Sequence, residues 1–121
     1  METDLHAMAR MHRGAFNGRD AESVAPLYNA TARAVRDGEL VGEGPRGVAR
    51  LLSEEARDDV VGQLLEVDGQ PMLFEYSGPE GRRVPTGVVR LELDGARVSG
   101  LRVDHDAAIV QRLVARAVRH D

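Results

Sequence analysis

The chain has 121 residues, enough for one domain with its own hydrophobic core, and we predict a single domain over residues 1–121. It has no cysteine, and all 16 of its basic residues are arginine. Disulfides, a thiol nucleophile, a Schiff-base lysine and a phosphate-loop lysine are therefore excluded. A net charge of −4 and only four aromatic residues argue against nucleic acid as a partner. No long apolar run indicates a secretory signal or a membrane span, so we expect a soluble cytoplasmic protein without a membrane partner.

The first half of the chain has the pattern of three short helices and two short strands. The helices are expected at residues 5–16, 21–28 and 45–56, and the strands at residues 31–36 and 39–42. Pro26 removes a backbone hydrogen bond inside the second helix, which should therefore be short or bent. Asp37 and Gly38 form a tight-turn signal between the two strands, which we expect at an edge of the sheet.

The second half of the chain changes from helical to alternating periodicity. Four apolar segments separated by short Gly-containing turns predict an antiparallel meander. Asp106 can then cap a last helix that carries an apolar stripe from Val110 to Ala117. The strands are expected at residues 60–67, 72–77, 84–93 and 97–103, and the last helix at residues 107–119.

Alternation along these strands predicts which side chains face the helices. Two apolar sets on neighbouring strands are both expected to do so. They are Met72, Phe74 and Tyr76 on one strand, and Val89, Leu91 and Leu93 on the other. On the last strand, a three-residue loop around Asp94 would turn Leu101 and Val103 inward, whereas a two-residue loop would turn Arg102 inward. The apolar pattern favours the first.

Three short segments follow one another in order between the predicted helices: FNGRD at 16–20, PLYNATA at 26–32 and GEGPRGV at 42–48. In sequence and order they resemble the SnoaL-like branch of the NTF2-like superfamily. The resemblance implies an α+β cone, in which N-terminal helices pack on a curved antiparallel sheet, with a C-terminal helix added. Steroid isomerases, polyketide cyclases, dehydratases, epoxide hydrolases and non-catalytic domains share this fold, so it implies no single reaction. Residues 67–76 and 91–106 also resemble the regulatory SnoaL-like domain of some sigma factors.

The ketosteroid-isomerase pattern within this superfamily can be compared residue by residue. The resemblance places His12 where that group has a hydroxyl donor and Arg36 where it has a carboxylate base, with Asp37 one residue away. The second, protonated acid falls near Val89, which has no proton to donate. Two of the three parts of an enolising isomerase are missing, so steroid-isomerase chemistry is not expected.

His12 is the leading candidate for a functional side chain. It lies four residues after Met8 and four before Phe16, which places it on the apolar face of the first helix. There it could act as a general base or donor, or be a hydrogen-bonded core residue. Tyr28 and Asp37 are the other candidate catalytic residues, although a core role explains Tyr28 more simply and a backbone turn explains Asp37 more simply. The candidate ligand-binding residues are Met8, His12, Phe16, Tyr28, Phe74, Tyr76, Val89 and Leu91.

Asp104, His105 and Asp106 are residue types that bind metals, but their arrangement argues against a metal site. Adjacent strand residues point to opposite faces, and Asp106 is needed as a helix cap. No other group of His, Asp or Glu has ligand spacing, so we expect neither a metal nor another cofactor. Glu75 and Arg90 are interpreted as an outward cross-strand ion pair.

These observations predict a binding domain for a small, mostly apolar molecule. One alternative is an isomerase, cyclase or hydrolase that uses His12 with Tyr28 or Asp37 for acid–base chemistry. Another is a regulatory or protein-interaction domain. We also expect a homodimer of twofold symmetry, because the outward face of the sheet and the last apolar stripe both need cover. The last helix would lie at the dimer rim or fold back on its own cone.

Overall fold

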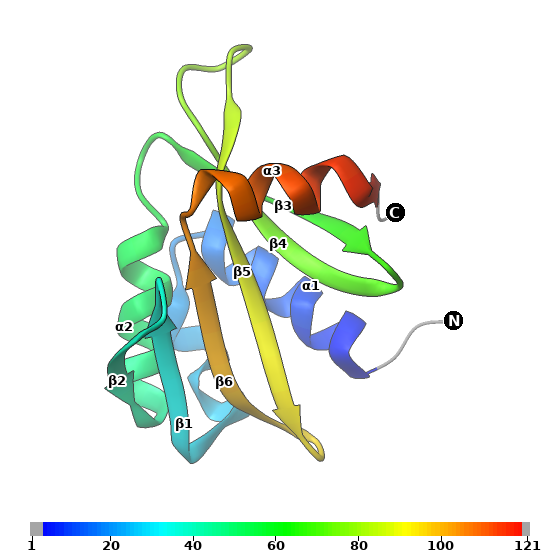
Figure 1. Ribbon diagram of the computed structural model, residues 1–121. Helices are drawn as coiled ribbons and strands as arrows, with labels where there is room; N and C mark the ends of the chain where they lie inside the picture. The colour runs from blue at the N-terminus through cyan, green and yellow to red at the C-terminus, as the bar shows by residue number, and fades with distance from the viewer. Residues whose placement is uncertain (1–3, 120–121) are drawn as a thin grey trace.

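The computed structural model describes residues 4–119, and these form a seven-stranded sheet with helices on both faces (Figure 1). In chain order the elements are α1 (Asp4–Asn17), the 3-10 helix η1 (Ala21–Leu27), β1 (Tyr28–Arg36), β2 (Glu39–Glu43), α2 (Gly44–Glu55), β3 (Val60–Val67), β4 (Gln70–Ser77), β5 (Val84–Asp94), β6 (Arg97–Asp104), α3 (Ala107–Arg116) and β7 (Ala117–Arg119). The strand order is β2-β1-β6-β5-β4-β3-β7. The predicted α+β class and the predicted order of helices and strands are confirmed.

Three features of the fold differ from the sequence prediction. The segment 21–27 is a 3-10 helix, because Pro26 inside it cannot donate the hydrogen bond of a continuous α-helix. The last helix ends at Arg116 rather than Arg119, and residues 117–119 form β7, which pairs with β3. The sheet is mixed rather than purely antiparallel, since β1 runs parallel to β6. This parallel pair brings the end of β1 beside the end of β6.

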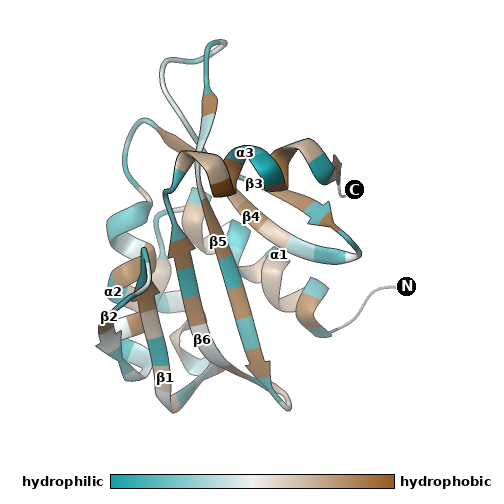
Figure 2. Ribbon diagram, viewed as in Figure 1, coloured by the Kyte–Doolittle hydropathy of each residue, from teal (hydrophilic) through white to brown (hydrophobic). Residues whose placement is uncertain are grey.

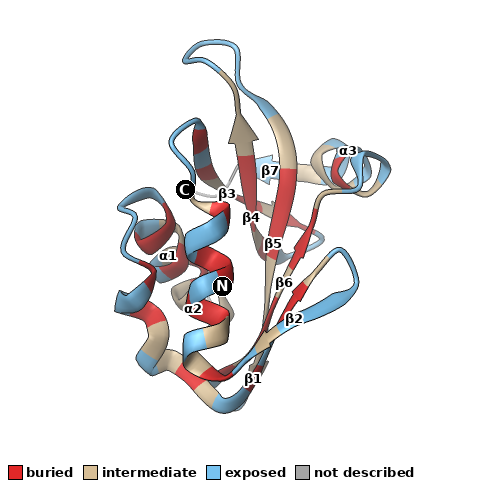
Figure 3. Ribbon diagram, turned by 90° about the vertical axis from the view of Figure 1, so that its left-hand side faces the viewer, coloured by how far each residue is buried: buried red, intermediate tan, exposed pale blue. Residues whose placement is uncertain are grey.

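The larger part of the core lies between the sheet and the N-terminal helices. Alternating residues of β4, β5 and β6 point to this face, among them Leu73, Val89 and Leu101, and they pack with Phe16 and Leu52 of the helices. Figure 2 shows the corresponding alternation of brown and teal along β5 and β6. Figure 3 shows that the buried side of α2 faces the sheet. The predicted inward facing of Val89, Leu91 and Leu93 is confirmed.

The smaller part of the core lies on the opposite face of the sheet, beneath α3. Phe74 and Val88 pack there with Val110 of α3, and Met72 and Tyr76 flank them. The prediction that the Met72, Phe74 and Tyr76 set shares a face with Val89 was therefore wrong. Cross-strand partners share a face, and the register pairs Phe74 with Val88 and Leu73 with Val89.

The β5–β6 hairpin combines features of the two alternatives that were considered for the facing of residues 97–103. Asp94 pairs with Arg97, so the turn has the two residues that would have turned Arg102 inward. However, the register shifts between Glu92 and Leu93, which leaves Ser99 as an extra residue on β6. This bulge restores the inward facing of Leu101, which is fully buried in the larger core.

Among the described residues, no helix combines the length and the apolar character needed to cross a membrane.

Candidate functional site

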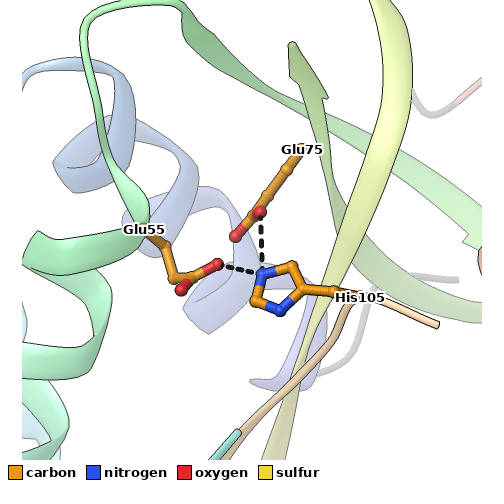
Figure 4. A group of neighbouring side chains, drawn as sticks. All are labelled: Glu55, Glu75 and His105. Carbon is orange, nitrogen blue, oxygen red and sulfur yellow. Dashed lines mark hydrogen bonds and ion pairs between the residues drawn. The ribbon is translucent and has the colours of Figure 1, made fainter. Parts of the chain in front are cut away.

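Four ionisable side chains meet at the end of the sheet where β1, β4 and β6 finish. Asp37 follows β1, Glu55 is the last residue of α2, Glu75 lies near the end of β4, and His105 connects β6 to α3. Figure 4 shows Glu55, Glu75 and His105 directed toward one another. We call these four residues the polar cluster. Its members come from four separate segments, so the fold alone assembles it.

The parallel pairing of β1 and β6 places Asp37 against His105. Arg36 is opposite Val103, and the turn after β1 continues with the Asp37 amide donating to the Val103 carbonyl at 2.8 Å. Asp37 and Gly38 both have positive φ angles, 50° and 84°, as a tight hairpin turn requires. The Asp37 carboxylate accepts hydrogen bonds from the His105 backbone at 2.7 Å and from His105 Nδ1 at 3.0 Å. The His105 ring is thus fixed through Nδ1, and Nε2 points away from Asp37.

The other ring nitrogen of His105 faces two carboxylates. Nε2 lies 2.6 Å from Glu55 Oε1 and 3.6 Å from Glu75 Oε1. Glu55 is in turn held by Arg36, whose Nε donates to Glu55 Oε2 at 3.2 Å. Both glutamates are buried, with exposures of 5% for Glu55 and 1% for Glu75.

Glu75 reaches the cluster because its cross-strand neighbour is a glycine. Gly87 of β5 pairs with Glu75, and a Cβ atom built on Gly87 would lie 2.5 Å from Glu75 Oε1 and 3.1 Å from His105 Cδ2. Any larger residue at position 87 would displace the carboxyl group. Glu75 Oε2 is buried and has no hydrogen-bond partner among the described residues. Such an atom is costly to bury, so its position calls for an explanation.

The pKa directions follow from burial and from the neighbouring charges. Burial, together with the adjacent Glu55 carboxylate, raises the pKa of Glu75 to about 9. Burial also acts to raise the pKa of Glu55, but the neighbouring Glu75 carboxyl and His105 outweigh it and lower that pKa. For His105, burial acts to lower the pKa, but the hydrogen bonds to Asp37 and Glu55 raise it overall. In the metal-free chain near neutral pH, Glu75 is therefore protonated, and Glu55 is the ionised member of the pair.

An open pocket of about 540 Å³ lies beside the polar cluster. It is lined by Asp37, Gly38, Asp104, His105, Asp106 and Ile109. Asp106 caps α3, as predicted, by accepting from the amides of Ala108 and Ile109. Asp104 forms an ion pair with Arg90. The three side chains at 104–106 therefore have separate partners, although all three residues line the pocket. The prediction that Glu75 pairs with Arg90 was wrong because Glu75 points to the helix-facing side.

The predicted site around His12 is a closed hydrogen-bonded pair. His12 Nδ1 donates to the Met8 carbonyl at 2.8 Å, and Nε2 accepts from the Tyr28 hydroxyl at 3.0 Å. Their rings lie 5.5 Å apart between centroids, and both residues are buried beside Phe16. Burial lowers the pKa of His12 and raises that of Tyr28, so both groups are neutral near pH 7. Both nitrogens of His12 are thus occupied within the core.

The structure does not gather the predicted site residues in one place. Met8, Phe16, Val89 and Leu91 pack in the larger core with the His12 pair. Phe74 and Tyr76 lie on the opposite face beneath α3, and Asp37 belongs to the polar cluster. Three prominent pockets lie on the described part of the chain, and none is lined by any of the eight predicted ligand-binding residues. Ligand binding beside His12 stays a prediction.

Three members of the polar cluster were not predicted as site residues: Glu55 was not considered, and Glu75 and His105 were considered and set aside. Glu55 follows Leu51 by four residues and Leu52 by three, which places it on the apolar face of α2. Glu75 stands within the apolar run between Phe74 and Tyr76. A glutamate on a buried face is unusual and marks a candidate site. His105 was noted only as part of the run 104–106, and its contact with Asp37 could not be predicted because it depends on the pairing of β1 with β6.

Comparison with solved structures shows the NTF2-like, cystatin-like fold. An uncharacterised cystatin-fold protein from Novosphingobium aromaticivorans matches with a TM-score of 0.61 and 16% identity, over 85% of this chain and 98% of that chain. An NTF2-like protein of unknown function from Cytophaga hutchinsonii matches with a TM-score of 0.58 and 11% identity, over 92% and 96%. A de novo designed protein with a curved β-sheet matches with a TM-score of 0.66 and 15% identity, over 95% and 98%. Likeness at such low identity defines the fold class and no activity.

No family model matches the sequence, and no curated protein matches it.

Proposed function

We propose that this chain is a small-molecule-binding protein whose ligand enters the pocket beside Asp37 and His105. The observation that carries the proposal is the convergence of two oriented polar groups on one pocket of about 540 Å³. Ligand sites commonly have volumes of about 300–1,000 Å³ and a few placed polar groups. The His12 pair offers the polar groups but borders none of the three pockets.

The lining of this pocket indicates the chemistry of the ligand. Three of its lining residues, Asp37, Asp104 and Asp106, have carboxylates, which can accept further hydrogen bonds beside those from within the chain, and Ile109 is an apolar lining residue. Carboxylates accept hydrogen bonds, so a complementary ligand has hydroxyl or amine donors next to a small apolar part. This differs from the mostly apolar ligand predicted for the interior of the cone.

A second candidate function is catalysis on the bound molecule, of the isomerase, cyclase or hydrolase kind. It is favoured by the orientation of His105, since a side chain fixed by a carboxylate partner is a common feature of enzyme sites. Under this second hypothesis Asp37, one of the predicted catalytic residues, orients His105 and does not take part in acid–base chemistry with His12.

A fragment screen by ¹H–¹⁵N NMR in the presence of EDTA tests the binding proposal. We expect donor-bearing fragments to shift the amides of Gly38, His105 and Ile109. An Ile109→Trp variant should fill the pocket and abolish these shifts, whereas Val84→Trp, at a position 57% exposed and outside the pocket lining, should leave them unchanged. Shifts confined to residues around His12 would refute the proposed location and support the ligand site that the sequence predicts around His12.

A further inference from the structure

We propose that Glu55, Glu75 and His105 of the polar cluster bind a divalent transition-metal cation. The ligand atoms would be Glu55 Oε1, Glu75 Oε1 and His105 Nε2. This inference goes beyond the proposed function, because a metal could bind here whether or not the neighbouring pocket accepts an organic molecule.

The ligand atoms are spaced for a shared cation. Metals that bind imidazole and carboxylate do so at about 2.0–2.2 Å, which places neighbouring ligand atoms about 3 Å apart. Here His105 Nε2 lies 2.6 Å from Glu55 Oε1 and 3.6 Å from Glu75 Oε1, distances on either side of that value. One ligand atom from each residue lies within 4.8 Å of the others.

Glu75 provides an independent observation that points to a ligand. Its side chain is 2% exposed, it points at Glu55 and His105, and its Oε2 has no partner among the described residues (Figure 4). A polar atom buried without a partner is costly, and a coordinated cation would supply a partner for this carboxyl group. Gly87 leaves room for the carboxyl at this point, so the β4–β5 pairing itself accommodates it.

Two of the three proposed ligands, His105 and Glu55, are also held by an outer partner. Asp37 accepts a hydrogen bond from Nδ1 of His105, which leaves Nε2 as the nitrogen available for coordination. Metal-binding histidines commonly have such a carboxylate or carbonyl partner on the other nitrogen. Arg36 donates to Glu55 Oε2 and so leaves Glu55 Oε1 directed at the cluster. The two outer contacts orient the ligands before any metal arrives.

The ligand types indicate which cations to test. One imidazole with two carboxylates suits Zn²⁺ or Mn²⁺, whereas Mg²⁺ and Ca²⁺ favour sites made of oxygen ligands alone. Three protein ligands would leave positions open for water or for a group of a molecule bound next to the cluster.

The test is calorimetric titration of the EDTA-stripped, dialysed full chain with Zn²⁺ and, separately, with Mn²⁺. We expect saturable binding of one ion per chain and a rise in melting temperature that grows with metal concentration. Glu75→Gln should weaken binding at least 100-fold, since it replaces a ligand carboxylate with a neutral amide of the same size. The matched control Glu80→Gln, at an exposed position between β4 and β5, should bind as the wild type does.

A second pair of variants tests the geometry without changing any ligand. Gly87→Ala should weaken binding at least 10-fold because its methyl group would displace Glu75, whereas Gly14→Ala, which has no atom within 4 Å of its new Cβ, should have no effect. Asp37→Asn should weaken binding about 10- to 100-fold, as expected for an outer partner. The proposal is overturned if the wild type binds neither ion, or if folded Glu75→Gln and Gly87→Ala bind as tightly as their controls. Since no organic ligand is present, failure here leaves the fragment screen as a separate test of the pocket.

Discussion

The raised pKa of Glu75 should make the free energy of unfolding depend strongly on pH. Burial raises the pKa of this group from 4.5 to about 9 in the folded chain. The folded chain therefore keeps a proton that the unfolded chain releases above pH 4.5, and the free energy of unfolding falls as the pH rises from about 4.5 to about 9. At pH 7 the difference spans about 2.5 pH units, which corresponds to about 3 kcal/mol.

Glu75→Gln isolates this effect, because glutamine has the size of a protonated glutamate and does not titrate. In metal-free buffer with EDTA, we expect the variant to match the wild type near pH 4.5 and to be more stable by up to about 3 kcal/mol at pH 7. Urea denaturation followed by far-ultraviolet circular dichroism at pH 4.5, 7 and 8.5 measures the difference. Glu80→Gln serves as the surface control. A stability difference that is constant across this pH range would refute the assignment of the proton to Glu75.

Three further predictions concern other parts of the molecule. Tyr28→Phe removes the donor to His12 Nε2 and leaves that atom buried without it, so urea denaturation should show a loss of about 1–3 kcal/mol. The hydrogen bonds that raise the pKa of His105 stabilise the fold below pH 6.5 and lose their effect as the pH rises through the raised value, so the stability difference between wild type and His105→Gln should shrink at alkaline pH. The homodimer stays a prediction, supported by exposed Leu40 and Val41 on the edge strand β2, and a particle of only 13.2 kDa in sedimentation equilibrium at high micromolar concentration would contradict it.

The order of helices and strands could be predicted because periodicity is a local property. Helical spacing identified the helices, and Pro26 signalled the departure from α-helix at 21–27. The fold-back of α3 on its own sheet agrees with one of the two placements considered, and Val110 is 1% exposed there. This contact covers much of the stripe that had been one reason to expect a dimer.

The facing of individual strands could not be predicted to the same extent. Alternation shows that Met72, Phe74 and Tyr76 share a face but does not say which face it is. That choice depends on the register with β5 and on α3, which supplies a second apolar layer. On β6, a bulge at Ser99 reversed the facing that the turn length alone implies.

The polar cluster could be predicted only in part for the same reason. Asp37 was identified as a candidate, but its partner is His105, 68 residues away, rather than His12. Their contact depends on the parallel pairing of β1 with β6, which an antiparallel meander does not contain. Glu55 lies 50 residues before His105, and Glu75 also lies far from it in the sequence, so no ligand-spacing motif links them.

The central claim is that binding takes place at the polar cluster and not at the His12 pair. Long-range ¹H–¹⁵N NMR of the histidine rings, recorded while Zn²⁺ is added to the metal-free protein, tests it most directly. The account predicts that one equivalent of Zn²⁺ shifts the Nε2 signal of His105 and leaves both ring signals of His12 unchanged. A shift at His12, or no shift at His105, would contradict it.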